Sequence, residues 1–210
     1  MSILKIIEYG NPILREKSKE VTKVSKKIKT LITDMLETMY SANGVGLAAP
    51  QVGQNLRIFV IDVSDPEGPI DPQIFVNPKI IKVSGAINSY EGCLSFPKAY
   101  TNVRRYSDVM VKALDINGRP FIKEAHNGEL LARAIQHEFD HLDGKLFIDH
   151  CRNRFETNNV LAKYNLPPVE ADKLLNEEEL EKSIIEYEKN HPEEAEKLRK
   201  EIEDSENQNG

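Results

Sequence analysis

A five-residue segment carries the most specific chemical signal in this sequence. The segment is His137-Glu138-Phe139-Asp140-His141. If it lies on an α-helix, its two histidines share one face, so both imidazoles can reach the same metal ion. The adjacent glutamate then lies beside the metal and can act on a water molecule. The pattern predicts a metal-dependent hydrolase, although three fixed residues also occur by chance on ordinary charged helices.

A catalytic metal site usually has a third protein ligand and keeps one coordination position open. Cys93 is the leading candidate, because it lies in Glu91-Gly92-Cys93-Leu94-Ser95, where the glycine allows close backbone approach. A lone cysteine is more often a small buried hydrophobic residue, and this interpretation is kept for Cys151. His150 is a weaker candidate ligand. By ligand type alone, two histidines and a thiolate favour zinc.

A hydrolase of amide bonds also needs hydrogen-bond donors placed beside the carbonyl oxygen. Negative charge gathers on that oxygen when a nucleophile attacks the carbonyl carbon. The side chain of Gln51 and the backbone N–H of Leu94 could supply such donors. Considered alone, Gln51 would more simply be a surface amide after Pro50.

Two stretches have the apolar spacing of amphipathic helices. The first runs from Ser25 to Met39, and Gly44 follows it as a stop signal. The second should begin near Asn127 and end at Gly144. It therefore carries both histidines of the motif, which is the arrangement that a shared metal ion requires.

The remaining patterns predict strands and turns. Segment 44–51 contains two glycines and indicates a loop, and Asn117-Gly118 is typical of a hairpin turn. The predicted strands, rich in β-branched and apolar residues, cover 56–63, 74–83, 109–115 and 121–125. These elements predict an α+β fold. Its antiparallel sheets pack around a central metal-binding helix, with an N-terminal helix and a helical acidic C-terminal tail.

Length and composition favour a single catalytic domain. The chain has 210 residues, of which 40% are hydrophobic and 30% are charged, as in ordinary globular proteins. We expect a catalytic domain over residues 1–166 and an extension over 167–210. No stretch has the roughly 18 apolar residues of a membrane span, and the first residues lack a signal-peptide pattern. The expected location is the cytoplasm, with both cysteines reduced.

The charge of the chain is unevenly distributed. The net charge is −6, but residues 170–210 alone contain 15 acidic and 6 basic side chains. Such an acidic segment is usually solvated, and it argues against direct binding of nucleic acid. Its apolar pattern is sparse and predicts a weakly packed helix; the apolar residues are Leu174, Leu175, Leu180, Ile184 and Ile185. We expect the end, from Asp204 onward, to be disordered.

Three segments together resemble the peptide deformylase family. They are Gly44-Val45-Gly46-Leu47-Ala48-Ala49-Pro50-Gln51, Glu91-Gly92-Cys93-Leu94-Ser95 and Gln136-His137-Glu138-Phe139-Asp140-His141-Leu142. Their order and spacing are similar to those of the family's three motifs, and the general likeness spans about residues 3–155. The joint occurrence of three motifs is much more specific than any one of them, so the likeness implies a deformylase catalytic domain.

The resemblance assigns roles to the metal site. It implies Cys93, His137 and His141 as metal ligands and Glu138 as the general base and acid. It also implies Fe²⁺ as the native ion, which is oxygen-sensitive and easily replaced by Zn²⁺ or Ni²⁺. The reaction implied is removal of the formyl group from the N-terminal methionine of newly made proteins, with release of formate.

The resemblance also assigns roles to the substrate site. It implies Gln51 and the Leu94 amide as donors to the oxyanion. The substrate is an N-formylmethionyl nascent chain, whose backbone would pair like an added strand with Val45, Gly46 and Leu47. The residues implied around the methionine side chain are Val45, Leu130, Ala134 and the ring of His137, with Glu91 close by.

Some features depart from the family pattern. Arg133 lies one turn before His137, where an aliphatic pocket residue is expected. Its stem could pack on the wall with the guanidinium pointing outward, or it could pair with a substrate or with Glu129. Tyr100 lies where a basic residue is common, so substrate preference beyond methionine can differ. Some relatives dock on the ribosome through a C-terminal helix, but ribosomal RNA would repel this acidic tail.

Two functional alternatives remain open on the residues alone. The same histidine pair and glutamate serve metallopeptidases, with Glu156 or His150 as a downstream ligand. Neither residue would explain the segment around Cys93. A catalytically silent metal-binding or chaperone-like module is the second alternative, and retention of Glu138 and Gln51 argues against it. Arg105 and Asp140 are candidates to support the ligands, because metal-bound histidines need a fixed hydrogen-bond partner.

Overall fold

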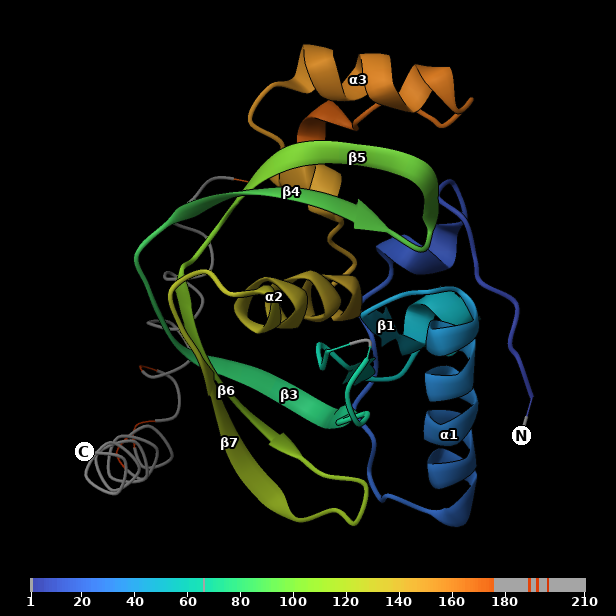
Figure 1. Cartoon of the computed structure of the whole chain (residues 1–210), viewed down its shortest axis with the longest axis vertical. Coiled ribbons are helices and arrows are strands. Elements are labelled where there is room, and N and C mark those ends of the chain that lie inside the picture. Colours follow the sequence, from blue (N-terminus) through green and yellow to red (C-terminus); the bar gives the residue numbers. More distant parts are fainter. Residues whose placement is uncertain (1, 66, 176–188, 190–191, 193–195, 197–210) are drawn as a thin grey trace.

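A computed structural model gives the structure of the chain, and it describes residues 2–65, 67–175, 189, 192 and 196. Within this part, two antiparallel sheets lie on either side of a helix, α2, which spans Leu130–Leu142 (Figure 1). The fold is thus a mixture of helices and antiparallel sheets, as predicted. Every helix in the described part is too short or too polar to span a lipid bilayer.

The larger sheet has five strands in the order β1-β2-β3-β6-β7. The strands are β1 (Gly46–Ala48), β2 (Ile58–Ile61), β3 (Gln73–Ser84), β6 (Asp108–Leu114) and β7 (Pro120–Ala125). The four strands after β1 confirm the predicted strand segments. Alternate residues of β6 face α2, where Val109, Val111 and Ala113 join a core cluster with Ile135 of the helix. This alternation explains why the runs of apolar and β-branched residues predicted these strands correctly.

The smaller sheet is a hairpin that the sequence did not reveal. It pairs β4 (Ile87–Cys93) with β5 (Phe96–Arg105). Much of β4 is polar, including Ser89 and Glu91, which are nonetheless buried. A strand that buries polar side chains gives no apolar alternation, so pattern reasoning cannot identify it.

Both predicted helices are present. α1 spans Lys26–Ser41, and the side chain of Ser25 caps it by accepting from the backbone N–H of Ile28. It covers one face of the larger sheet, where Met35 packs in a core cluster with Val60. α2 covers the opposite face of the same sheet.

The start of α2 differs from the prediction by about one turn. Asn127 and Gly128 have φ angles of 55° and 66°, so the chain makes a left-handed turn there and the helix begins only at Leu130. Gly144 ends the helix region as predicted, with a φ of 68°. A Cβ at this glycine would lie 2.4 Å from the carbonyl oxygen of Arg15, so only glycine fits.

Segment 44–51 was expected to be a loop, and this prediction was partly wrong. Its residues form the short strand β1 and the beginning of a 3-10 helix, η2, which spans Ala49–Val52. β1 is specified by pairing with β2, in which Leu47 lies opposite Val60, and this partner is distant in sequence. Local propensity cannot predict a strand that long-range pairing creates.

The remaining elements follow α2. They are the 3-10 helices η3 (Phe147–His150) and η4 (Ala171–Lys173) and the helix α3 (Arg154–Lys163). The helix α3 was not predicted. Before α1, near the N-terminus, lies one more 3-10 helix, η1 (Pro12–Arg15). The first part of the predicted extension contacts the domain. Val169 is buried, and Glu170 forms an ion pair of 3.1 Å with Arg15. The helical tail was predicted over 167–210 and its disordered end from Asp204, and beyond Leu175 this segment lies almost entirely outside the described residues.

Candidate active site

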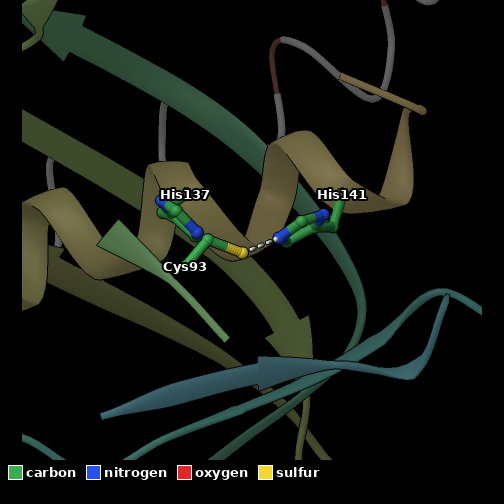
Figure 2. Close-up of side chains that lie close together, drawn as sticks. All are labelled: Cys93, His137 and His141. Atoms are coloured by element: carbon green, nitrogen blue, oxygen red, sulfur yellow. Dashed lines mark hydrogen bonds between the residues drawn. The ribbon is translucent and has the colours of Figure 1, made fainter. Parts of the chain in front are cut away.

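Three predicted ligands converge between α2 and the end of β4. The metal-binding atoms of Cys93, His137 and His141 all lie within 4.8 Å of one another. Figure 2 shows Cys93 between the two histidines, and its Sγ lies 3.3 Å from Nε2 of His141. Both histidines are buried, and Cys93 is half-buried. One thiolate and two imidazoles at this spacing fit a transition-metal ion such as Zn²⁺ or Fe²⁺.

A buried carboxylate fixes the orientation of one histidine. Nδ1 of His137 lies 3.0 Å from Oε2 of Glu91, so its Nε2 is left to face the other ligands. Nδ1 of His141 is buried without a hydrogen-bond partner among the described residues. Glu91 thus orients His137, while the polar contact of His141 is the one between its Nε2 and Sγ of Cys93.

Glu91 in turn belongs to a buried ion network around Arg105. The guanidinium of Arg105 donates from Nε and Nη2 to the two carboxylate oxygens of Glu91, at 3.0 and 2.9 Å, and from Nη1 to Asp140. Burial alone would raise the pKa of Glu91, but Arg105 and His137 outweigh it and hold this pKa well below its ordinary range. The residues predicted to support the ligands are therefore in contact with one another.

The second carboxylate of this network contacts a further histidine. Nε2 of His150 lies 3.0 Å from Oδ2 of Asp140, so His150 faces this carboxylate and is not part of the group formed by the three ligands. Burial favours a higher pKa for Asp140, but His150 and Arg105 together lower it far below its ordinary range. Asp140 thus stays ionised and balances the charge of Arg105.

Glu138 lies at the bottom of the cleft beside β1. A Cβ at Gly46 would lie only 2.4 Å from Oε1 of Glu138, so the absence of a side chain there makes room for the carboxylate. Burial raises the pKa of Glu138 to about 7, although the nearby His137 partly opposes this shift. Oε2 has no hydrogen-bond partner among the described residues. The carboxyl group is therefore free to interact with a substrate or a water molecule.

Gln51 is not a surface amide. Its Oε1 accepts a hydrogen bond of 2.8 Å from the backbone N–H of Ala48, which fixes the direction of the amide. Its Nε2 donates to Sγ of Cys93 at 3.3 Å and to Oγ of Ser95 at 3.2 Å. The NH₂ group thus points toward the group formed by Cys93, His137 and His141, which we call the ligand cluster. Ser95 was not expected to take part, because an isolated serine carries no pattern.

The ligand cluster opens into a cleft of about 630 Å³. Most of the predicted substrate and catalytic residues line it: Val45, Gly46, Glu91, Leu94, Leu130, Ala134 and Glu138. Leu47 differs from them, because its side chain is fully buried in a core cluster with Met35 and Met39. The side chain of Leu47 is therefore separated from the cleft, and Gln51 lies outside its lining but contacts Cys93, which does line it.

Arg133 also lines the cleft, and it makes a contact that was not expected. Its Nη1 donates to Oγ of Ser89 on β4 at 3.2 Å, so the guanidinium spans the space between α2 and β4. Glu129 is otherwise engaged, since its Oε1 accepts from the backbone N–H of His126 at 3.1 Å. This contact with Ser89, which no sequence pattern indicated, takes the place of the outward orientation and of the pair with Glu129. A pair between Arg133 and a substrate stays a prediction.

Comparisons with known proteins agree on one family. The sequence model described as polypeptide deformylase matches residues 3–156. The chain is 51% identical over 150 residues to a peptide deformylase of Endomicrobium trichonymphae, which covers 71% of this chain and 87% of that one. It is 48% identical over 150 residues to peptide deformylase 1 of Clostridium perfringens, covering 71% of this chain and 99% of that one.

Solved structures give the same result. A peptide deformylase from Synechococcus elongatus, crystallised in complex with actinonin, superposes with a TM-score of 0.75 at 40% identity, covering 83% of this chain and 91% of that one. The peptide deformylase of Thermotoga maritima gives a TM-score of 0.67 at 40% identity, covering 73% of this chain and all 100% of that one.

Proposed function

Because the chain belongs to the peptide deformylase family, which removes the formyl group from the N-terminal methionine of newly made proteins, we propose that its active site is the cleft around Cys93, His137, His141 and Glu138. One observation supports this assignment above the others. Three side chains that could hold a metal ion come together from segments far apart in the sequence, and two of them, Cys93 and His137, line the cleft with the buried carboxylate of Glu138. The family membership also identifies the chain as a hydrolase.

The proposed cofactor is a ferrous ion held by Cys93, His137 and His141. A metal ion there would supply Lewis-acid chemistry, lowering the pKa of water and polarising the formyl carbonyl. The donor set supports either iron or zinc, because a soft thiolate and imidazoles bind both. The preference for Fe²⁺, with Zn²⁺ or Ni²⁺ as a substitute, rests on the family resemblance.

Glu138 is proposed to move the proton. Its carboxylate takes a proton from the attacking water and returns it to the nitrogen of the departing amine, which frees the methionine amino group. Burial and the lack of a partner for Oε2 support this role, because the group has no competing ion pair. The Oε1 atom, close to Gly46, faces the position where the substrate backbone would lie.

Gln51 and the backbone N–H of Leu94 are proposed to stabilise the oxyanion. Donors of this kind act most strongly when the protein holds them in place before the reaction. The hydrogen bond from Ala48 to Oε1 of Gln51 does this, because it leaves only the NH₂ group to face the metal ligands. Leu94 follows the ligand Cys93 directly and lines the same cleft.

The substrate backbone is proposed to extend β1. This strand is at the edge of its sheet, and Val45 accepts from the backbone N–H of Asp62 on one side. Hydrogen bonds alternate along an antiparallel strand, so the N–H and C=O of the next residue, Gly46, face the free edge. An extended peptide can pair with them. The side chain of Leu47 is buried, so Leu47 would act only by holding the backbone of β1 in the position that pairs with the substrate.

The methionine side chain is proposed to enter the part of the cleft beside α2. Leu130 and Ala134 lie seven and three residues before His137, so all three share one helical face. Val45 lines the opposite side, and Glu91 lies behind the ring of His137. The partner is an N-formylmethionyl nascent chain. The acidic extension over 167–210 is not proposed to bind ribosomal RNA, and the cytoplasmic location stays a prediction from the sequence.

The function is tested by loading the metal-free protein with Fe²⁺ under anaerobic conditions and measuring formate from formyl-Met-Ala-Ser. We expect turnover with Fe²⁺, its loss when a chelator removes the ion, and its return on reloading with Fe²⁺ or Ni²⁺. Parallel samples loaded with Zn²⁺ show how strongly the rate of formate release depends on the identity of the metal ion. Formate release that is unaffected by chelation would contradict the metal site.

A further inference from the structure

Two exposed tyrosines lie side by side at the mouth of the cleft. Tyr90 of β4 is 66% exposed and Tyr100 of β5 is 51% exposed. Their rings are stacked, with centroids 5.8 Å apart and planes 22° from parallel, and both residues line the cleft. Large aromatic side chains are usually at least partly covered in a folded protein. Two stacked rings beside a binding cleft therefore suggest a contact surface for a ligand.

The hairpin holds this pair in place. Gly92 lies opposite Tyr100, and Tyr90 lies opposite Asn102, so the two tyrosines project from the same face of the hairpin. A Cβ at Gly92 would lie 2.4 Å from Cε1 of Tyr100. The Tyr100 ring thus lies flat across a strand position that has no side chain. The pair is a fixed feature of the strand register and not two independent surface residues.

Alternation along the strands determines which substrate residue can reach this pair. In β4, Glu91 points toward α2, where it binds His137, while Tyr90 and Gly92 point to the other face. A peptide bound in the extended form between β1 and β4 alternates in the same way. If its first side chain points toward α2, its second side chain points away from α2 and toward the two tyrosines.

We propose that Tyr90 and Tyr100 form a subsite for the side chain of the second substrate residue, and that this subsite favours aromatic side chains. The inference rests on the proposed deformylase function and names a substrate preference within it. A flat side chain can extend the stack of the two rings, whereas alanine or serine would leave them uncovered.

The test compares kcat/KM for formyl-Met-Phe-Ser and formyl-Met-Ala-Ser on the metal-loaded enzyme. One aromatic contact predicts a preference of about fivefold for phenylalanine. We expect the preference to fall to nearly one in Tyr100→Ala and in Tyr90→Ala, and to persist in Tyr100→Phe. The change should lie mainly in KM, because the second side chain is bound equally in the ground and transition states.

Tyr164→Ala is the matched control, since Tyr164 is 41% exposed and lies outside the cleft lining. It should keep the wild-type preference. Thermal unfolding of each variant shows whether it is folded. If Tyr100→Ala does not fold, Tyr90→Ala alone tests the subsite. Equal kcat/KM for the two peptides in the wild type, or an unchanged preference in both alanine variants, would overturn the subsite. Absence of formate from both peptides would instead refute the deformylase function.

Discussion

Replacing Glu138 with glutamine should lower kcat for deformylation by about 10²-fold to 10⁴-fold, the range expected when a general base and acid is lost. The amide has nearly the shape of the carboxylate, so it fits the same buried position beside Gly46. It cannot accept a proton from water or return one to the amine. Cys93, His137 and His141 are unchanged, and the metal should therefore stay bound.

The measurement for Glu138→Gln combines steady-state formate release with the metal content of the same sample. Glu129→Gln is the matched control, because it makes the same change just before α2, outside the cleft lining. It should leave kcat close to the wild-type value. Wild-type activity in Glu138→Gln would show that another group moves the proton. Loss of activity together with loss of the metal would mean that Glu138 serves the metal site itself.

Replacing Gln51 with leucine should lower kcat by about 10²-fold to 10³-fold, as expected when one donor of an oxyanion site is removed. Leucine is an apolar side chain that is one atom shorter and has no NH₂ group to hold the developing charge. KM should change much less than kcat, because the interaction is made mainly in the transition state. The same variant loses the contacts to Cys93 and Ser95, so its metal content must be measured alongside.

Gln54→Leu provides the control for this substitution. Gln54 is exposed and lies three residues further along the chain, so the same change there removes no contact to the cleft. Its kcat should match that of the wild type. A Gln51→Leu variant that binds metal normally and turns over at the wild-type rate would exclude the proposed oxyanion role. A rise in KM at constant kcat would instead assign Gln51 to substrate binding.

The helices and most strands could be predicted because their apolar residues repeat with the period of the element. The three ligands could be predicted for a different reason. His137 and His141 have a spacing that places both imidazoles on one face of a helix. The need for a third ligand made Cys93 the leading candidate, and the resemblance to a family then implied the same residue. The structure brings these three together, and it turns the amide of Gln51 toward them.

What the sequence did not reveal depends on contacts between distant segments. The hairpin of β4 and β5 buries Ser89 and Glu91, so it lacks the apolar alternation of a recognisable strand. The guanidinium of Arg133 was expected to point outward, but a hydroxyl on β4 accepts from it. The stacking of Tyr90 on Tyr100 depends on the strand register, and no local pattern reports a register.

The most direct test of the account follows both products of one reaction. A formylated protein is incubated with the anaerobic, Fe²⁺-loaded enzyme, and formate, new amino termini and chain length are measured together. The account predicts equal amounts of formate and free N-terminal methionine, with every internal peptide bond intact. Shortened chains without formate would contradict it, because they would show that the same histidine pair and glutamate serve a peptidase.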